Sequence, residues 1–135
     1  MTYPLSKIEG LTPYFASKLK PLGIRTAEAL LEAARTAKGR RELAAKTGIS
    51  EQQLLKWANF ADHMRIRGMG KGKIELIQAA GVTTVRELSL RNPSRLSQSM
   101  RDANTVRKLV RAMPSEKSVE RLIEQARRLP PKISY

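Results

Sequence analysis

The stretch "MRIRGMGKGKIELIQAAGVTTVREL", residues 64–88, places three glycines and two lysines between two apolar runs. Glycine inside a helix is less favourable than alanine by about 1 kcal/mol. Gly68, Gly70 and Gly72 therefore indicate a turn rather than continuous helix. Such a turn exposes backbone N–H groups, and the lysines set positive charge beside them. The pattern predicts two helices joined by a turn that can receive an anion.

The same pattern occurs earlier in the chain. "IEGLTPYFASKLKPLGIRTAEAL", which starts at Ile8, aligns without a gap with the segment that starts at Ile66, at an offset of 58. A looser match sets Ser50 and the residues after it beside Ser115, at an offset of 65. The second copy is therefore seven residues longer (65 minus 58). We predict two tandem units, 1–65 and 66–135.

The apolar positions predict an all-α protein in which the two units pack into a compact helical fold. Each convincing pattern has the three- or four-residue spacing of a helix, and none alternates. Four hydroxyl residues are predicted N-caps: Thr26, Ser50, Thr84 and Ser115. Gly23 and Gly81 are predicted to end helices. Trp57 continues the apolar stripe of the helix after Ser50, which favours a place in the core over a stacking surface.

The charge of the chain indicates a polyanionic partner. Twenty-six Lys and Arg against twelve Asp and Glu leave a formal net charge of +14. The halves on either side of the Arg65–Ile66 bond carry +5 (11 minus 6) and +9 (15 minus 6). Such an excess opposes compaction unless a polyanion offsets it, so nucleic acid is the first partner to expect. No apolar run is long enough to span a bilayer, and we expect a cytoplasmic protein with no membrane partner.

Neither catalysis nor metal binding is predicted. The chain has no cysteine, which excludes disulfides and thiolate chemistry. His63 is the sole histidine and has no carboxylate or cysteine at ligand spacing. The acidic residues are scattered, and no nucleophile and base can be paired. We therefore expect no catalytic residue, no metal site, no cofactor and no small-molecule substrate.

The turns carry a resemblance to a known motif. Ile66, Gly68, Met69 and Gly70 follow the form apolar, any, Gly, apolar, Gly of the helix-hairpin-helix. "AKTGISEQQLLKW", residues 45–57, resembles the second hairpin of recombinase amino-terminal domains and of the RNA polymerase alpha carboxy-terminal domain. Nearly the whole chain is similar to a family of uncharacterised proteins built from tandem helix-hairpin-helix units. The likeness of the hairpins implies SAM-like units of the kind that grip the sugar-phosphate backbone of DNA without reading bases, whereas the family implies a fold and leaves the function open.

The candidate phosphate contacts follow from the turns and the cations near them. In the second unit they are Arg65, Arg67, Gly68, Gly70, Lys71, Gly72, Lys73, Arg107, Lys108 and Arg111. In the first unit they are Arg40, Arg41, Lys46, Gly48 and Ser50. The turn at Gly10 matches less well, because Thr12 replaces the second glycine and Pro13 removes an amide donor. The turn at Met113 and Pro114 has no glycine and is predicted to serve packing alone.

We therefore predict a protein that binds duplex DNA with little sequence preference, as an architectural or nucleoid-associated protein or as an accessory of DNA repair. One alternative is a sequence-reading helix-turn-helix, in which Gln52, Gln53 and Lys56 of the helix after Ser50 touch bases in the major groove. A second alternative is an RNA- or ribosome-binding protein, or an adaptor whose basic face meets an acidic protein. The sequence leaves the oligomeric state open.

Overall fold

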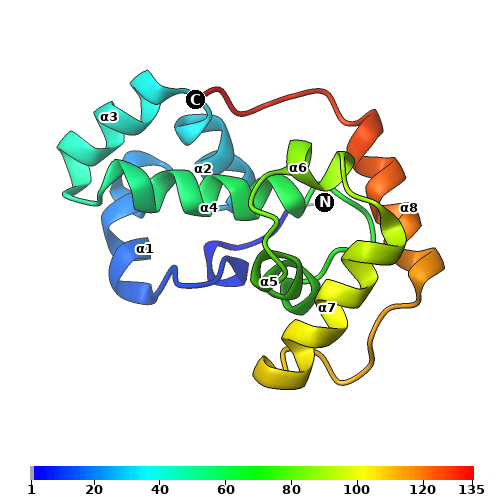
Figure 1. The fold of residues 1–135 in the computed structure, drawn as a ribbon. Coiled ribbons are helices and arrows are strands. Elements are labelled where there is room, and N and C mark those ends of the chain that lie inside the picture. The colour runs from blue at the N-terminus through cyan, green and yellow to red at the C-terminus, as the bar shows by residue number, and fades with distance from the viewer. Residues whose placement is uncertain (1) are drawn as a thin grey trace. The chain divides into compact units, whose positions relative to one another are not determined.

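A computed structural model describes residues 2–135 (Figure 1). Those residues form eight α-helices and two short 3-10 helices, and they contain no strand beyond an isolated bridge between Pro4 and Thr26. The prediction of an all-α protein is confirmed.

The contacts of the chain divide it into two compact units. Unit 1 comprises the described residues as far as Asp62 together with the tail Pro131–Tyr135, and unit 2 comprises His63–Pro130. The predicted division after Arg65 lies three residues from this boundary (65 minus 62). The predicted second unit also included the tail, which instead groups with unit 1. The chain therefore passes between the units twice.

Unit 1 is built from four α-helices and two 3-10 turns. In chain order these are η1 (Leu5–Lys7), α1 (Pro13–Leu19), η2 (Lys20–Leu22), α2 (Ala27–Ala34), α3 (Ala37–Thr47) and α4 (Glu51–His63). The Trp57 side chain is fully buried, and its ring packs edge-on against Phe15 with 5.2 Å between centroids. Trp57 is therefore a core residue, as the apolar stripe predicted.

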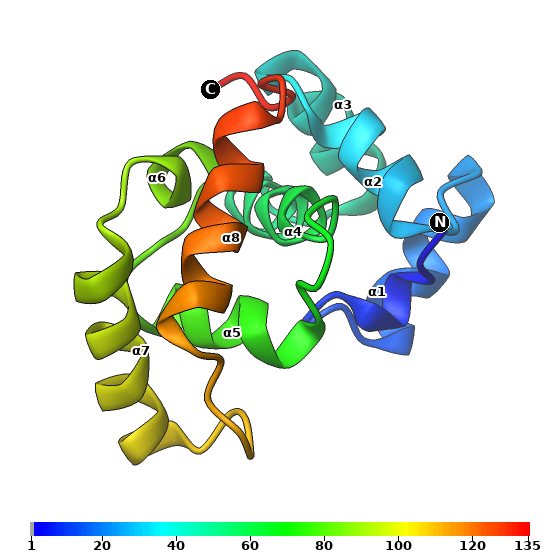
Figure 2. The ribbon, with the colours of Figure 1, turned by 90° about the vertical axis from the view of Figure 1, so that its right-hand side faces the viewer.

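Unit 2 repeats the order of short and long helices. It contains α5 (Lys71–Ala79), α6 (Val85–Ser89), α7 (Pro93–Arg107) and α8 (Glu116–Arg128). One face of α8 buries Val119, Leu122, Ile123 and Ala126. Helix α8 packs against α6 and α7, and α5 packs against α7 (Figure 2). Burial stabilises the unit by about 1.5–3 kcal/mol for each of Val119, Leu122 and Ile123, and by less for the smaller Ala126.

The predicted helix boundaries agree with the structure. Hydroxyl oxygens accept a backbone N–H at each predicted N-cap: Ala29 on Thr26 (3.1 Å), Gln53 on Ser50 (3.1 Å), Glu87 on Thr84 (3.0 Å) and Ser118 on Ser115 (3.1 Å). Gly23 and Gly81 lie just after helices with φ of 81° and 97°, values that suit glycine. Local chemistry therefore accounts for most helix ends.

The second copy is longer in two places, and it is shorter by two residues between Thr84 and α7 than between Thr26 and α3 (9 against 11 positions). Helix α7 has 15 residues where its counterpart α3 has 11. Each helix ends at a residue with left-handed backbone, Gly48 after α3 and Lys108 after α7. Ser50 follows Gly48 by two positions, whereas Ser115 follows Lys108 by seven. A longer α7 and a longer connection to α8 therefore distinguish unit 2 from unit 1.

Candidate nucleic-acid interface

The turn before α5 presents exposed backbone. Gly68 has a φ of 82°, a left-handed value that glycine adopts without strain. Gly70 is the N-cap of α5, has extended backbone (φ −85°, ψ 171°), and makes no side-chain cap. Both glycines are exposed, and a Cβ placed on either would meet no atom within 4 Å. The space in front of these residues is open to a ligand.

The start of α5 differs from most other helix starts in the described chain. Side chains of Thr, Ser or Asn cap α2, α3, α4, α6, α7 and α8. Helices α1 and α5 follow the two repeated glycine turns, and neither has a side-chain cap. The first-turn amides of a helix have no intrahelical acceptor, and the helix dipole adds positive potential there. An external anion can supply the missing acceptor.

Two lysines occupy the first turn of α5. The Lys71 side chain is exposed, and the Lys73 ammonium donates to the Gly68 carbonyl at 3.0 Å. That contact holds a positive charge over the turn and draws the Gly68 carbonyl into a hydrogen bond. Arg67, immediately before Gly68, is exposed. The amides and the cations of the prediction therefore lie together at one helix start.

The segment after α7 packs against the same helix start. A Cβ on Gly72 would lie 3.2 Å from Val110 Cγ1 and 3.3 Å from the Leu109 carbonyl oxygen, so only glycine permits this approach without a shift. The contact brings the stretch that contains Lys108 and Arg111 beside α5. The predicted residues Arg107, Lys108 and Arg111 are all exposed. The sequence analysis grouped these three residues with the turn before α5 because of their charge alone. In the structure, the contact of Gly72 with Leu109 and Val110 brings their segment next to α5.

Asn104 fixes the shape of this second segment. Its side-chain Nδ2 donates to the Val110 carbonyl at 3.1 Å, and its Oδ1 accepts from the Val110 N–H at 3.0 Å. Lys108 has a φ of 50° and is the single non-glycine residue with positive φ among residues 2–135. Such a conformation costs about 1 kcal/mol or more outside glycine. The segment is therefore held in one conformation despite that cost.

Gln125 fixes the first turn in a similar way. Its Oε1 accepts from the Arg67 N–H at 3.0 Å, and its Nε2 donates to the Arg67 carbonyl at 3.1 Å. Arg65 lies nearby in sequence and is half-buried, and its guanidinium reaches the Pro130 carbonyl at 3.5 Å. Sequence reasoning missed both side-chain amides. Gln125 binds backbone 58 residues away, which leaves no local pattern, and no sequence signal marks the bonds of Asn104 to Val110, six residues further on.

The candidate contacts in unit 1 are less uniform. Gly48 has a φ of 76° and is exposed, as are Arg41 and Lys46. Ser50 is also exposed, but its hydroxyl already accepts from Gln53 N–H, and Glu51 adds a carboxylate to the first turn of α4. One of the four helix-start amides is thus satisfied internally, and the nearby carboxylate repels phosphate. This turn is a poorer anion site than the start of α5.

Arg40 requires a correction. It was predicted as a phosphate contact, but its side chain is only 4% exposed. Its guanidinium donates to the Ala34 carbonyl and to the Ser134 carbonyl, each at 2.8 Å. The residue therefore ties the tail Pro131–Tyr135 to α2 and α3. A buried guanidinium that already donates to two backbone carbonyls is not available to nucleic acid.

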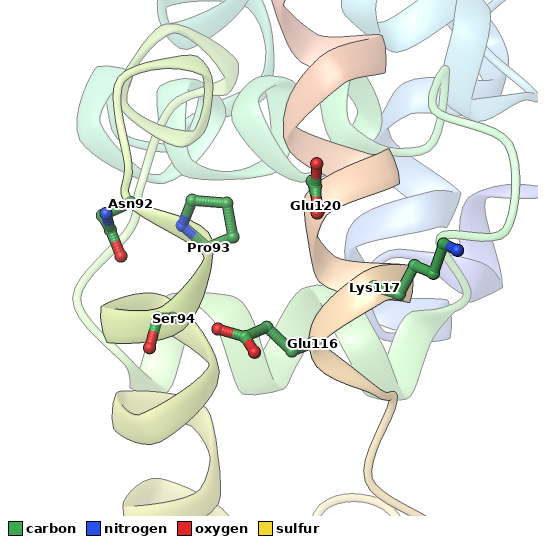
Figure 3. A pocket seen from close by; sticks show the side chains of 6 residues that line it. All are labelled: Asn92, Pro93, Ser94, Glu116, Lys117 and Glu120. Atoms are coloured by element: carbon green, nitrogen blue, oxygen red, sulfur yellow. The ribbon is translucent and has the colours of Figure 1, made fainter.

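A pocket in unit 2 has the wrong charge for a polyanion. It has a volume of about 460 Å³ and lies between the starts of α7 and α8, lined by Asn92, Pro93, Ser94, Glu116, Lys117 and Glu120. Figure 3 shows the Glu116 carboxylate directed toward Ser94, whereas Lys117 points away from α7. Two carboxylates on this wall disfavour phosphate. Among residues 2–135, no three His, Asp or Glu side chains are grouped so that they could hold a metal ion.

The helix-turn-helix alternative places α4 in the major groove. Gln52 and Lys56 are exposed in its first half, and Gln53 is partly exposed. Every residue in the second half, 57–63, is buried. A helix that reads bases needs an open face along the part that enters the groove. Helix α4 offers such a face over its first turns alone.

Residues 9–129 match the family described as "Domain of unknown function (DUF4332)", and the chain belongs to that family. No curated protein and no solved structure matches the chain. In the described residues, no helix has the length and apolar character needed to cross a membrane.

Proposed function

We propose that this member of the DUF4332 family binds duplex DNA through its phosphates, with little preference for base sequence. The principal contact is the start of α5 in unit 2, which we interpret as the anion-binding turn of a helix-hairpin-helix. We further propose that the chain is made of two such units, and that it acts in the cytoplasm, on the nucleoid if the source is bacterial, as an architectural protein or a repair accessory.

One observation carries the proposal: a helix start without a side-chain cap has cations on both sides of it. Lys71 and Lys73 lie in the first turn, and the segment with Lys108 and Arg111 adjoins Gly72. In residues 2–135 no carboxylate forms an ion pair with Arg67, Arg107, Lys108 or Arg111. Amides, a helix dipole and nearby cations together favour a phosphate oxygen over any neutral ligand.

The distribution of charge supports a long polyanion rather than a single small anion. The chain carries a formal net charge of +14, and candidate cations occur in both units. Neutralising several phosphates releases condensed counterions, which makes binding strong at low salt and weak at high salt. A protein that uses backbone amides and charge in this way gains affinity without reading base edges.

The burial of 57–63 in α4 is why we prefer this function to a sequence-specific regulator. Duplex RNA and acidic polypeptides present negative charge as well, so the experiment includes them as competitors. Fluorescence polarisation with a random-sequence DNA duplex, repeated across salt, should give a logarithmic affinity that falls linearly with the logarithm of salt concentration. Unlabelled duplex DNA should compete better than duplex RNA or polyglutamate.

A pair of charge-matched variants tests the location. Lys71→Ala with Lys73→Ala should weaken binding and make the salt slope shallower by about two, because each phosphate contact contributes about 0.9. Arg86→Ala with Arg95→Ala removes the same charge from exposed positions elsewhere in unit 2 and should leave the slope nearly unchanged. Equal salt slopes for the two pairs of variants would place the interface elsewhere. A duplex affinity that does not change with salt concentration would refute phosphate binding.

A further inference from the structure

Val106 stands out on the surface of unit 2. It is 82% exposed, more than any other large apolar side chain among the described residues. It lies in the last turn of α7, directly before Arg107 and Lys108 and close in sequence to Arg111. Figure 2 shows the end of α7 and the segment that follows it extending beyond the first turn of α8. An apolar side chain is therefore displayed among cations at a projecting tip.

The tip is held rigidly. The Lys108 N–H donates to the Asn104 carbonyl at 2.8 Å and ends the helix in a left-handed residue. The Asn104 side chain makes two hydrogen bonds to Val110, and Leu109 and Val110 pack on Gly72 of α5. Fixing these residues in advance removes much of the entropy loss that binding would otherwise require.

A comparison of the two units shows that valine is an unusual choice here. When the left-handed residues Gly48 and Lys108 are superposed in sequence, Val106 occupies the position of Lys46. Lysine is a better helix former than valine and is readily solvated. Valine at an exposed helix end is therefore unfavourable in propensity and in hydration. A ligand with apolar surface within reach would offset both effects.

We propose that Val106 is an apolar wedge that enters a groove of the bound duplex and bends it. This inference rests on the proposed function, because the duplex must first be held by the phosphate contacts of α5 and by the cations around Val106. Base steps are the apolar surface that such a ligand offers, and apolar side chains inserted between them unstack and kink DNA. The cations that follow Val106, namely Arg107, Lys108 and Arg111, then contact phosphates that the bend brings closer.

The test is energy transfer between dyes at the two ends of a duplex of about 30 base pairs with a flexible pyrimidine–purine step at its centre. The wild-type chain should raise the transfer efficiency on binding. Val106→Ala should lose most of that rise and bind several-fold more weakly. Leu90→Ala, which truncates another exposed apolar side chain of unit 2 (74% exposed), should behave as wild type.

Val106→Lys distinguishes bending by an apolar wedge from bending by positive charge alone. It installs the residue of the equivalent unit 1 position and should bind as tightly as wild type or more tightly at low salt, yet without bending. Bending by Val106→Ala or Val106→Lys equal to wild type would overturn the wedge. Duplex binding without bending by the wild type would overturn the wedge alone, whereas absence of binding would overturn the proposed function with it. A change in sedimentation of Val106→Ala with unchanged bending would instead assign Val106 to contacts between copies of the chain.

Discussion

The side-chain amide of Gln125 satisfies both backbone hydrogen-bonding groups of Arg67, accepting from its N–H at 3.0 Å and donating to its carbonyl at 3.1 Å. Helix α8 thereby fixes the residue that precedes Gly68, in the turn that leads into α5. Because a side-chain amide can donate and accept at once, one residue performs both tasks. The orientation of the proposed phosphate site therefore depends on a residue of another helix, α8.

Gln125→Ala should loosen this turn without changing the charge of the protein. The loss of two partly exposed hydrogen bonds should lower the free energy of unfolding by about 1–2 kcal/mol. Duplex affinity should fall several-fold while the salt slope stays the same, because no cation is removed. Hydrogen exchange at residues 66–69 and polarisation across salt provide the measurements. Wild-type affinity together with faster exchange would show that the turn need not be fixed before binding.

Gln125→Glu provides a second measurement of the same relationship. The carboxylate retains an acceptor for the Arg67 N–H, but it cannot donate to the Arg67 carbonyl when ionised. Its charge also lies near the proposed site, so it should weaken binding more than Gln125→Ala does at low salt. The difference between the two variants should shrink as salt rises, because screening acts on the added charge alone.

Arg40 and Arg41 are adjacent in α3 and should respond oppositely to truncation. Arg40→Ala leaves the carbonyls of Ala34 and Ser134 without their donor, and should reduce the stability of unit 1 by about 2–3 kcal/mol. Urea unfolding followed by the fluorescence of Trp57, the one tryptophan in the chain, measures this change.

Arg41→Ala removes an exposed charge, so its stability should stay within about 0.5 kcal/mol of wild type. At temperatures where both variants are folded, only Arg41→Ala should weaken duplex binding and make the salt slope shallower. A reduced salt slope for Arg40→Ala would show that the buried guanidinium reaches phosphate after all.

Local sequence chemistry was sufficient to predict the helical class and most helix ends. Thr26, Ser50, Thr84 and Ser115 cap the helices that follow them, as predicted, because a hydroxyl at an N-cap acts on an amide three residues away. The exposed turn at Gly68 and Gly70 was also predicted from local chemistry, because glycines so close together disfavour a continuous helix. The residues that determine these helix ends and this turn lie within a few positions of them in the sequence.

The features that escaped prediction depend on residues far apart in the chain. Arg40 is buried because the tail at Ser134 returns to unit 1, a separation of 94 residues. Gln125 meets Arg67 across 58 residues. Lys108 adopts a left-handed conformation that lysine rarely adopts and that its residue type does not predict. The packing of Leu109 and Val110 on Gly72 depends on the length of α7. Charge alone therefore grouped Arg40 with cations that are truly exposed.

Gly39→Ala should destabilise unit 1 even though alanine is the better helix former by about 1 kcal/mol. A Cβ at Gly39 would lie 2.4 Å from the Ala33 carbonyl oxygen, which is backbone and cannot turn away. The shift that relieves this overlap should cost about 1–3 kcal/mol. Urea unfolding of Gly39→Ala, with Lys38→Ala as an exposed control in the same helix, measures the effect. A more stable Gly39→Ala would mean that the junction of α2 and α3 yields easily.

Gly70→Ser separates stability from binding at the start of α5. Serine is a slightly better N-cap than glycine, by a few tenths of a kcal/mol, because its hydroxyl accepts an N–H of the first turn. The backbone of Gly70 suits any residue (φ −85°), and a Cβ there meets no protein atom within 4 Å. The variant should therefore be as stable as wild type or more stable in thermal unfolding.

Duplex affinity of Gly70→Ser should nevertheless fall, because the hydroxyl takes an amide that phosphate would otherwise use and the new Cβ occupies the space in front of the turn. The charge is unchanged, so the loss should persist at low salt, unlike the loss caused by removing a lysine. Ser50→Gly, which removes the cap of α4, serves as the converse control and should lower stability slightly without impairing binding at α5. If Gly70→Ser folds and binds duplex as tightly as wild type, the main-chain amides of this turn do not hold phosphate, and the lysines and arginines alone must account for affinity.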